Sequence, residues 1–270
     1  MPHRSDRPVT HRIPEPSGLP VGDLPTHWHP QGPLTVDLPV PQVALAIGAH
    51  PDDVELGCGA TLAKWAAAGC RLHHLVLTDG SKGTWEVDAD RAALVATRRR
   101  EQQAAAGILG GGEVTFLDWA DGELPSDLPA RRQVCAVIRQ VQPDVVLGHD
   151  PWRRYRLHPD HRHAGWLTLD GVVAARDPQF FPELGLASHR PRRLLLWEAD
   201  VANHLEDAAG FERVKTDALL AHRSQHGTTM GIASADQVAT LEAKVRRQLA
   251  AHGALGGLHA AEAFHCIADL

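Results

Sequence analysis

Two short segments of the sequence carry side chains that can bind a metal ion and move a proton. The first is His50-Pro51-Asp52-Asp53, one imidazole followed by two adjacent carboxylates. His50 and Asp53 are three residues apart across the start of a helical turn, so both can reach one ion while Asp52 points elsewhere. A carboxylate beside a metal-activated water is a natural general base. Capping of the next helix by Asp52 or Asp53 is the alternative, and it explains one carboxylate but not the whole unit.

The second segment is Leu157-His158-Pro159-Asp160-His161, which repeats the His-Pro-Asp order. A catalytic zinc site has three protein ligands and an open position, and a second turn that faces the first would supply the third ligand. Each segment alone is also compatible with an ordinary capped turn. Together, in equivalent places of the chain, they indicate a metal hydrolase.

Both segments follow apolar runs that are typical of strands in a parallel sheet. Residues 43–49 are almost continuously apolar, as in a strand buried on both faces, and Pro51 ends this strand in a turn. Residues 54–68 then favour a helix, and 144–148 is the equivalent strand before the second segment. Ligand sites of open α/β sheets lie at the carboxyl ends of strands, so both turns are expected at one edge. The glycine-rich stretch 56–61 does not directly follow the strand, so we interpret it as a helix–strand packing site rather than a phosphate loop.

The rest of the chain alternates between strand and helix patterns, which predicts an α/β fold. Further strands are expected at 71–78, around Phe116-Leu117 and at 193–197, and further helices at 89–109, 129–141, 160–174 and 211–222. The capping box Ser234-x-x-Gln237 opens a long amphipathic helix, and residues 260–265 favour a last short strand. The expected architecture is a Rossmann-like, mostly parallel sheet with helices on both faces and a helical C-terminal part.

The composition predicts one folded domain preceded by an arm. The 270 residues are 43% hydrophobic and 22% charged, which is enough for a sizeable core over residues 41–270. Residues 1–40 are rich in proline and favour an extended chain. We expect its last part, 26–40, to be anchored on the domain or on a neighbouring subunit through Trp28 and residues 34–38.

Charge and cysteine usage limit the possible partners and compartment. The net charge of −6 provides no general attraction to nucleic acid or to an anionic membrane. No apolar run is long enough to span a bilayer, and the first residues lack the apolar core of a signal peptide. The four cysteines lie far apart in the sequence and form no Cys-x-x-Cys motif, so we expect them to be reduced thiols. Reduced thiols are typical of the cytoplasm, so a cytoplasmic location is expected.

The two segments resemble the PIG-L/LmbE-like family of zinc-dependent N-acetylglucosaminyl deacetylases. The likeness is carried by Ala49-His-Pro-Asp-Asp-Val-Glu55 and by His158-Pro-Asp-His161. Weaker matches extend it over about residues 43–226: Leu77-Thr-Asp-Gly80, Arg98-x-x-Glu101, Asp121-Gly122, Lys215, His222 and Ser224-Gln225.

The resemblance implies roles for the matching residues. It makes three of them ligands of zinc or of another divalent transition metal: His50, Asp53 and His161. Asp52 would be the general base that takes a proton from the attacking water and passes it to the leaving amine. His158, as a cation, would stabilise the oxyanion, and Asp160 would orient an adjacent imidazole.

The resemblance also singles out residues that would bind the substrate. Arg98 would lie near the sugar, with Glu101 three residues on and able to pair with it. Asp121 would contact a sugar hydroxyl or support a metal ligand. Apart from the resemblance, the loop 149–157 before the second segment is basic and aromatic and borders the expected metal site, so Trp152 and Tyr155 are expected to stack on a sugar face. The alternative for this loop is an ordinary exposed surface.

The predicted function is hydrolysis of the N-acetyl group of an amino sugar or its glycoside. Two alternatives stay open: action on another N-acyl compound, such as a thiol–sugar conjugate or an antibiotic intermediate, and a non-enzymatic sugar-binding protein. Asp52 argues against the second, because a mere binding site does not need that base. The expected partner is a small amino sugar, and the resemblance makes a trimer or hexamer plausible.

Overall fold

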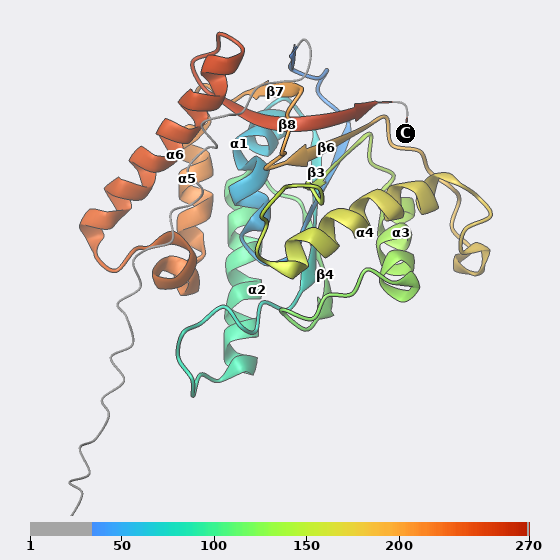
Figure 1. Ribbon diagram of the computed structural model, residues 1–270, viewed down its shortest axis with the longest axis horizontal. Coiled ribbons are helices and arrows are strands. Elements are labelled where there is room, and N and C mark those ends of the chain that lie inside the picture. The colour runs from blue at the N-terminus through green and yellow to red at the C-terminus, as the bar shows by residue number, and fades with distance from the viewer. Residues whose placement is uncertain (1–33, 269) are drawn as a thin grey trace, which may run out of the picture.

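A single mixed sheet forms the centre of the computed structural model, which describes residues 34–268 and 270 (Figure 1). Its eight strands lie in the order β1-β7-β8-β6-β5-β2-β3-β4. Their bounds are β1 Thr35–Val36, β2 Val43–Gly48, β3 Arg71–Thr78, β4 Glu113–Trp119, β5 Val145–His149, β6 Arg193–Trp197, β7 His204–Asp207 and β8 Ala261–Ala268. Only β8 runs antiparallel to its neighbours, so the Rossmann-like, mostly parallel sheet is confirmed.

The chain changes direction across the sheet at β2. From β2 it continues to β3 and β4 on one side, and it later returns to β5 and β6 on the other side. The crevice between the carboxyl ends of β2 and β5 is therefore a topological switch point, the place where open α/β sheets bind ligands.

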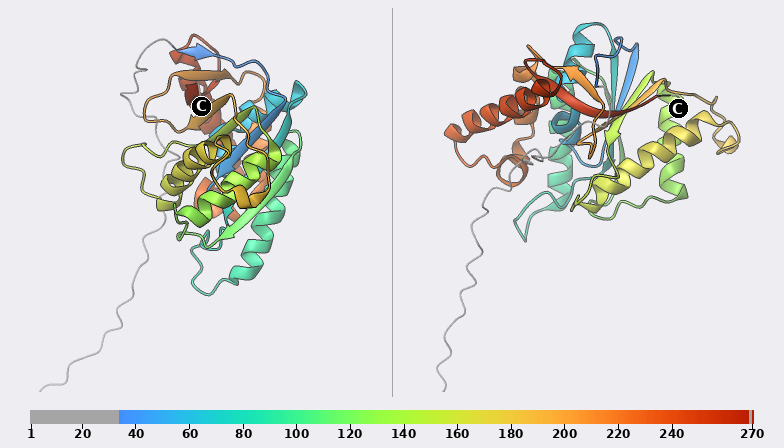
Figure 2. Two further views of the ribbon diagram at one scale, coloured as in Figure 1. Left: turned by 90° about the vertical axis from the view of Figure 1, so that its right-hand side faces the viewer. Right: turned by 45° about the horizontal axis from the view of Figure 1, so that its top comes forward.

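Helices cover both faces of the sheet (Figures 1 and 2). Their bounds are α1 Asp53–Ala67, α2 Arg91–Ile108, α3 Leu128–Val141, α4 Pro159–Arg176, α5 Glu212–Ala221 and α6 Ala235–Leu255, with short turns at η1 Pro182–Leu184, η2 Arg223–Gln225 and η3 His226–Met230. Side chains alternate along each strand, so Leu45 and Ile47 pack with α3 and α4, whereas Ala44 and Ala46 pack with α1. Two apolar layers thus pack on the two faces of the sheet.

Helix α1 is interrupted at Cys58, whose backbone angles (φ −146°, ψ 21°) are not helical. The break frees backbone groups that must find other partners. Glu262 of β8 accepts the N–H of Ala60 at 3.1 Å, and Lys215 of α5 donates to the carbonyl of Leu56 at 2.7 Å and to Glu262. Glu262 and Lys215 therefore provide hydrogen-bond partners for the backbone groups that the break in α1 frees.

The glycine-rich stretch serves packing, as the sequence predicts. A Cβ added at Gly57 would lie 2.5 Å from the ring of Trp197, so only glycine lets this indole sit against α1. Trp197 ends β6, next to β5 in the sheet. Gly57 therefore makes room for the large indole of Trp197 at the carboxyl end of β6, close to the switch point.

The described part of the N-terminal segment lies on the domain. β1 pairs in parallel with β7, and the backbone N–H of Leu38 donates to Glu206 at 2.8 Å. Lys64 also binds Glu206, at 2.6 Å. The rest of the expected arm, including Trp28, lies outside the described residues, and a division of the chain at residue 40 stays a prediction. Among the described residues, no helix is both long and apolar enough to cross a membrane.

Candidate active site

The two His-Pro-Asp segments meet at the switch point. The first follows β2, and the second opens α4 beside the carboxyl end of β5. His50 Nδ1 lies 3.1 Å from His161 Nε2 and 3.4 Å from Asp53 Oδ2, and His161 Nε2 lies 3.4 Å from Asp53 Oδ1. Ligands of a tetrahedral ion with bonds of about 2.0–2.1 Å are separated by about 3.3 Å. Each pair of the three predicted ligands therefore lies close together, with His50 facing Oδ2 of Asp53 and His161 facing Oδ1. Among the described residues, His50, His158 and His161 also offer ligand atoms close enough to hold one ion.

The surroundings of His50 leave its Nδ1 atom free to bind a metal. Its other nitrogen, Nε2, lies 3.1 Å from Asp160 Oδ2 and 3.2 Å from Asp121 Oδ1. Two carboxylates can only accept there, so Nε2 carries the proton. Burial lowers the pKa of His50, but Asp121, Asp160 and Asp53 together raise this pKa well above its usual value. The same negative field attracts a cation.

Asp160 is held in place to orient His50. Its Oδ2 accepts the N–H of Gly122 at 2.7 Å and its Oδ1 accepts the N–H of Leu124 at 3.2 Å. These contacts fix the Asp160 carboxylate against His50 Nε2, and its orienting role stays a prediction.

His149, at the end of β5, is a part of the site that the sequence analysis did not assign. The indole N–H of Trp197 donates to His149 Nδ1 at 3.0 Å, and His149 Nε2 lies 3.2 Å from Asp53 Oδ2. Tryptophan can only donate, so Nδ1 is the acceptor and Nε2 carries the ring proton. The N–H of Ala49 also points at this Nε2, but at 3.4 Å, and the shorter indole contact decides the tautomer.

In this tautomer His149 orients Asp53 by donating to its carboxylate. Asp53, His149 and His161 lie close enough together to hold an ion. A nitrogen that carries a proton cannot ligate one, however, and His149 instead donates to Asp53. Asp53 Oδ2 also accepts the N–H of His50 at 2.7 Å, which leaves Oδ1 facing His161. The signal for His149 was its place at the end of a predicted strand, at the same sheet edge as both turns.

Asp52 lies beside the three predicted ligands with its carboxylate almost unoccupied. Its closest charged partner is Arg98, whose Nη2 is 3.4 Å from Asp52 Oδ2. Burial raises the pKa of Asp52 to about 6, although the positive charge of Arg98 opposes this rise. A carboxylate with this pKa is ionised at neutral pH and still basic enough to accept a proton from water.

His158 is exposed at the mouth of the site, with its ring 4.6 Å from that of His50 and 4.9 Å from that of His161. Partial burial and the neighbouring His50 lower the pKa of His158 below its usual value of 6.5. Its environment therefore favours the neutral ring, which offers an N–H donor, and the role of His158 stays a prediction.

Arg98 is buried next to Asp52. It is 3% exposed, and its guanidinium donates to the carbonyls of Pro51 at 2.6 Å and Gly80 at 2.9 Å. The expected pairing of Arg98 with Glu101 is wrong, because Glu101 turns the other way and accepts both the N–H and the hydroxyl of Ser224. A direct contact of Arg98 with a sugar stays a prediction.

The other predicted substrate residues differ in how deeply they are buried. Asp121 is buried against His50, as expected for a residue that supports a metal ligand. Trp152 is 53% exposed and packs edge-on against Trp166 at 5.1 Å, and Tyr155 is 93% exposed. Trp152 is thus held firmly enough to present a ring face to a ligand.

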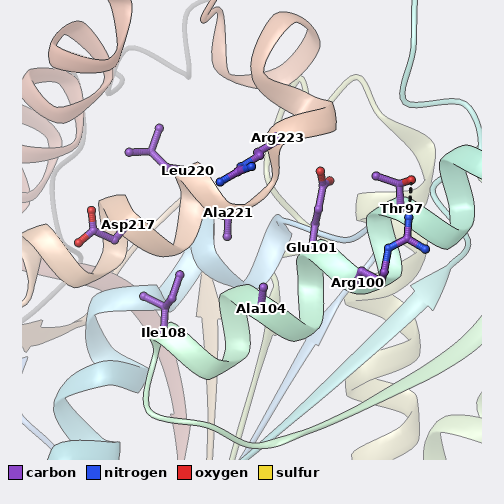
Figure 3. Close-up of a pocket in the computed structure, with 9 residues that line it drawn as sticks. All are labelled: Thr97, Arg100, Glu101, Ala104, Ile108, Asp217, Leu220, Ala221 and Arg223. Carbon is purple, nitrogen blue, oxygen red and sulfur yellow. Dashed lines mark hydrogen bonds between the residues drawn. The ribbon is translucent and has the colours of Figure 1, made fainter. Parts of the chain in front are cut away.

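A shallow pocket lies elsewhere, between α2 and α5 (Figure 3). Its lining residues are Thr97, Arg100, Glu101, Ala104, Ile108, Asp217, Leu220, Ala221 and Arg223. None of the candidate ligands or of the residues next to them lines it. This pocket is therefore separate from the chemistry at the switch point.

Comparison with known proteins agrees with this geometry. Residues 45–171 match the PIG-L family, which is described as GlcNAc-PI de-N-acetylase. The diacetylchitobiose deacetylase of Thermococcus kodakarensis is 36% identical over 184 residues, which are 67% of this chain and 69% of that protein. The chain belongs to the PIG-L family.

Two further PIG-L family comparisons support the assignment. A 1D-myo-inositol 2-acetamido-2-deoxy-alpha-D-glucopyranoside deacetylase of Mycobacterium avium is 37% identical over 143 residues, and the match covers 43% of this chain and 47% of that relative. The structure of N,N'-diacetylchitobiose deacetylase from Pyrococcus horikoshii aligns with a TM-score of 0.77 and 29% identity over 84% of both chains. This PIG-L family member is accordingly an N-deacetylase.

Proposed function

We propose that the protein removes the acetyl group from an N-acetylglucosamine-type amino sugar or its glycoside, with zinc as the metal. The observation that carries this proposal is the convergence of His50, Asp53 and His161 beside the buried carboxylate of Asp52, whose charged partner is Arg98 at 3.4 Å. The relatives are named for substrates of this type, a chitin disaccharide and an inositol glycoside of acetamido sugar.

The donor set fits the metal that the reaction needs. Two neutral imidazoles and one carboxylate would leave the bound ion with a net positive charge. A divalent ion held by these residues lowers the pKa of water and polarises an amide carbonyl. Burial lowers the pKa of His161 well below its usual value, so this ring is neutral. The guanidinium of Arg156 donates to its Nδ1, so binding of a metal at Nε2 would displace the proton of that nitrogen.

The side chains of the protein then move the protons. Asp52 accepts a proton while the water oxygen bonds to the acetamide carbon. The carbonyl oxygen becomes an oxyanion, to which the N–H of His158 donates. When the C–N bond breaks, the proton on Asp52 passes to the leaving nitrogen, and the products are acetate and the free amine.

The loop before the second segment would form the rim of the sugar site. Trp152 presents an exposed ring that can stack on the apolar face of a pyranose. Arg153 and Arg154 are tied to the carbonyl of Glu198 and the carboxylate of Asp200, which holds the loop beside the site. Contacts of Trp152 and Tyr155 with the sugar belong to this proposal, as does a trimeric or hexameric assembly.

The test is acetate release from a panel of acetamido sugars, including free N-acetylglucosamine, diacetylchitobiose and an inositol glycoside. We expect acetate and free amine in equal amounts from at least one compound. Chelation should abolish the release, and zinc should restore it better than manganese or iron. Asp52→Asn protein, purified and loaded in parallel, controls for contaminating enzymes. No release from any compound, despite one bound metal per chain, would favour a different N-acyl substrate.

A further inference from the structure

Asp52 occupies a backbone conformation that aspartate rarely adopts. The N–H of Asp53 donates to the carbonyl of His50 at 3.3 Å, which closes a four-residue turn with Pro51 in the second position. Asp52, in the third position, has φ 105° and ψ −22°. Proline followed by a residue with positive φ is the pattern of a type II turn, in which the third residue is usually glycine. Because the base needs a carboxylate, the protein keeps a strained residue here.

The orientation of the peptide between Pro51 and Asp52 distinguishes a type II turn from a type I turn. Rotating this peptide by about 180° exchanges its carbonyl and its N–H and gives Asp52 the negative φ of a type I turn. The turn type therefore sets the direction in which the Asp52 carboxylate leaves the backbone.

Two side chains of helix α2 form hydrogen bonds with the carbonyl and the N–H of this peptide. Arg98 donates to the carbonyl of Pro51 at 2.6 Å, and Gln102 Oε1 accepts the N–H of Asp52 at 2.9 Å. Arg98 and Gln102 are four residues apart, so they lie on one face of the helix. A flipped peptide would turn its N–H toward the guanidinium and its carbonyl toward the amide oxygen, and both contacts would be lost.

The two gripping side chains are themselves held in position. Gln102 Nε2 donates to Glu55 Oε1 at 2.8 Å, which fixes the amide so that its oxygen faces Asp52. The other oxygen of Glu55 lies 3.2 Å from His222 Nε2. Arg98 also donates to the carbonyl of Gly80 at 2.9 Å. Glu55, Gln102 and His222 are fully buried, so none of them exchanges its partner for water.

Helix α2 is in turn fastened to the C-terminal part of the chain. On the next face of α2, Glu101 binds Ser224 of η2, beside the pocket of Figure 3. The helix that holds the turn is thus itself hydrogen-bonded to η2 in the C-terminal part of the chain.

We propose that Gln102 and Arg98 are positioning residues that hold the Pro51–Asp52 peptide in the type II orientation and thereby aim the Asp52 carboxylate. This inference rests on the proposed role of Asp52 as general base. Gln102 is not among the residues expected to contact the substrate, so it tests the positioning role without that complication. The contribution of both side chains is to keep a carboxylate in a conformation that glycine would adopt unaided.

The first experiment compares Gln102→Leu with Gln103→Leu, an equal change at the exposed neighbouring position. Because displacing a reacting group by about 1 Å costs up to roughly 100-fold in rate, we expect Gln102→Leu to lower kcat by about 10- to 100-fold. KM should stay within about twofold, since no substrate contact is removed, and Gln103→Leu should match the wild type. Both variants should bind one metal per chain with unchanged affinity.

A rescue variant separates positioning from mere packing. Glu55→Gln combined with Gln102→Glu keeps both hydrogen bonds. The carboxylate at 102 accepts the N–H of Asp52 as the amide oxygen does, and donor and acceptor are exchanged only in its bond to the new amide at 55. This double variant should recover most of the kcat that Gln102→Leu loses. Should Gln102→Leu fail to fold, Gln102→Asn takes its place, because its amide is too short to reach both partners.

A crystal structure of Gln102→Leu tests the inference without any activity measurement. A negative φ at Asp52, or a displaced Asp52 carboxylate, supports the grip even if no acetamido sugar proves to be a substrate. An unchanged turn together with wild-type kcat overturns it. Loss of metal affinity along with kcat would also overturn it, because it would make Gln102 a support of the metal site rather than of the base.

Discussion

The two His-Pro-Asp segments have the same sequence and fold differently. In the first, Pro51 and Asp52 form the middle of a turn, and the helix begins only at Asp53. In the second, His158 is the N-cap with φ −69° and ψ 120°, and Pro159 is already the first helical residue. A residue with positive φ occurs only in the first.

The difference decides what each aspartate can do. Asp160, inside the first turn of α4, receives two backbone N–H groups and His50, so its oxygens are fully used. Asp52 is instead held through its backbone N–H, which donates to Gln102. Its carboxylate meets Arg98 at 3.4 Å. A base must keep a free oxygen lone pair. The structure therefore favours Asp52 as the base and Asp160 as the orienting residue, although both follow His-Pro.

The largest effect is expected for His161→Ala, which removes the metal ligand that the second segment supplies. We expect loss of bound metal and a fall in activity of about 10³-fold or more. Metal analysis of the purified variant, alongside its acetate release, checks this. Full metal occupancy in His161→Ala would show that the ion is held elsewhere.

Asp52→Asn should separate the base from the metal. The amide keeps the shape of the side chain but cannot accept the proton, so kcat should fall by about 10²–10⁴-fold. Metal content should stay at the wild-type level, because Asp52 is not one of the three converging ligands. A metal-free, inactive Asp52→Asn protein would contradict the assignment of the base.

His158→Phe tests the exposed member of the second segment. Loss of one donor to a developing oxyanion typically lowers kcat by about 10²–10³-fold. Metal affinity and unfolding free energy should not change, since this ring is exposed and is not one of the three proposed ligands, although it lies close to two of them. His158→Phe is thus expected to lower kcat and keep the metal, whereas His161→Ala, three residues away, is expected to lose both. Loss of metal in His158→Phe would make it a ligand.

Gly57→Ala tests the packing behind the first segment. The new methyl group would meet Trp197, whose indole orients His149. Overpacking of this kind should lower the free energy of unfolding by about 1–3 kcal/mol. The matched change Gly107→Ala, in α2 with open space around the new methyl group, should raise it by up to about 1 kcal/mol. Urea unfolding of both variants checks the opposite signs, and equal effects would exclude a clash at Trp197.

The smallest effect concerns the pH dependence of stability, through Glu55 and His222 beneath the first segment. Burial raises the pKa of Glu55, but His222 lowers it below its ordinary 4.5 overall. Burial lowers the pKa of His222, but Glu55 raises it above its ordinary 6.5 overall. Stability from Glu55 is lost as pH falls below 4.5, and stability from His222 is lost as pH rises above 6.5.

The ion pair should therefore stabilise the fold most between these two pH values. We expect the difference in unfolding free energy between the wild type and Glu55→Gln to peak there, with a change on the order of 1 kcal/mol across the profile. Chemical unfolding at a series of pH values measures it. A flat difference would mean that the two groups do not form an ion pair in the folded state.

The sequence by itself determined the local parts of this protein. The apolar run before His50, the proline after it and the three-residue spacing to Asp53 lie within one short segment, and so does the second segment. The structure places these segments at one sheet edge, as predicted, because strand pattern and turn chemistry are properties of neighbouring residues. The family resemblance added the roles of the individual side chains, which remain proposals.

Only the tertiary structure decided which distant residues support the site. His149 meets Asp53 from a neighbouring strand, and Gln102 reaches Asp52 from a helix that begins some forty residues later in the chain. Arg98 turned toward the peptide of the turn rather than toward Glu101, and Glu262 closed a break in α1 from the far end of the chain. Such contacts depend on strand order and on which helix face meets the sheet. No local pattern specifies either, because each is set by how all the apolar layers pack together.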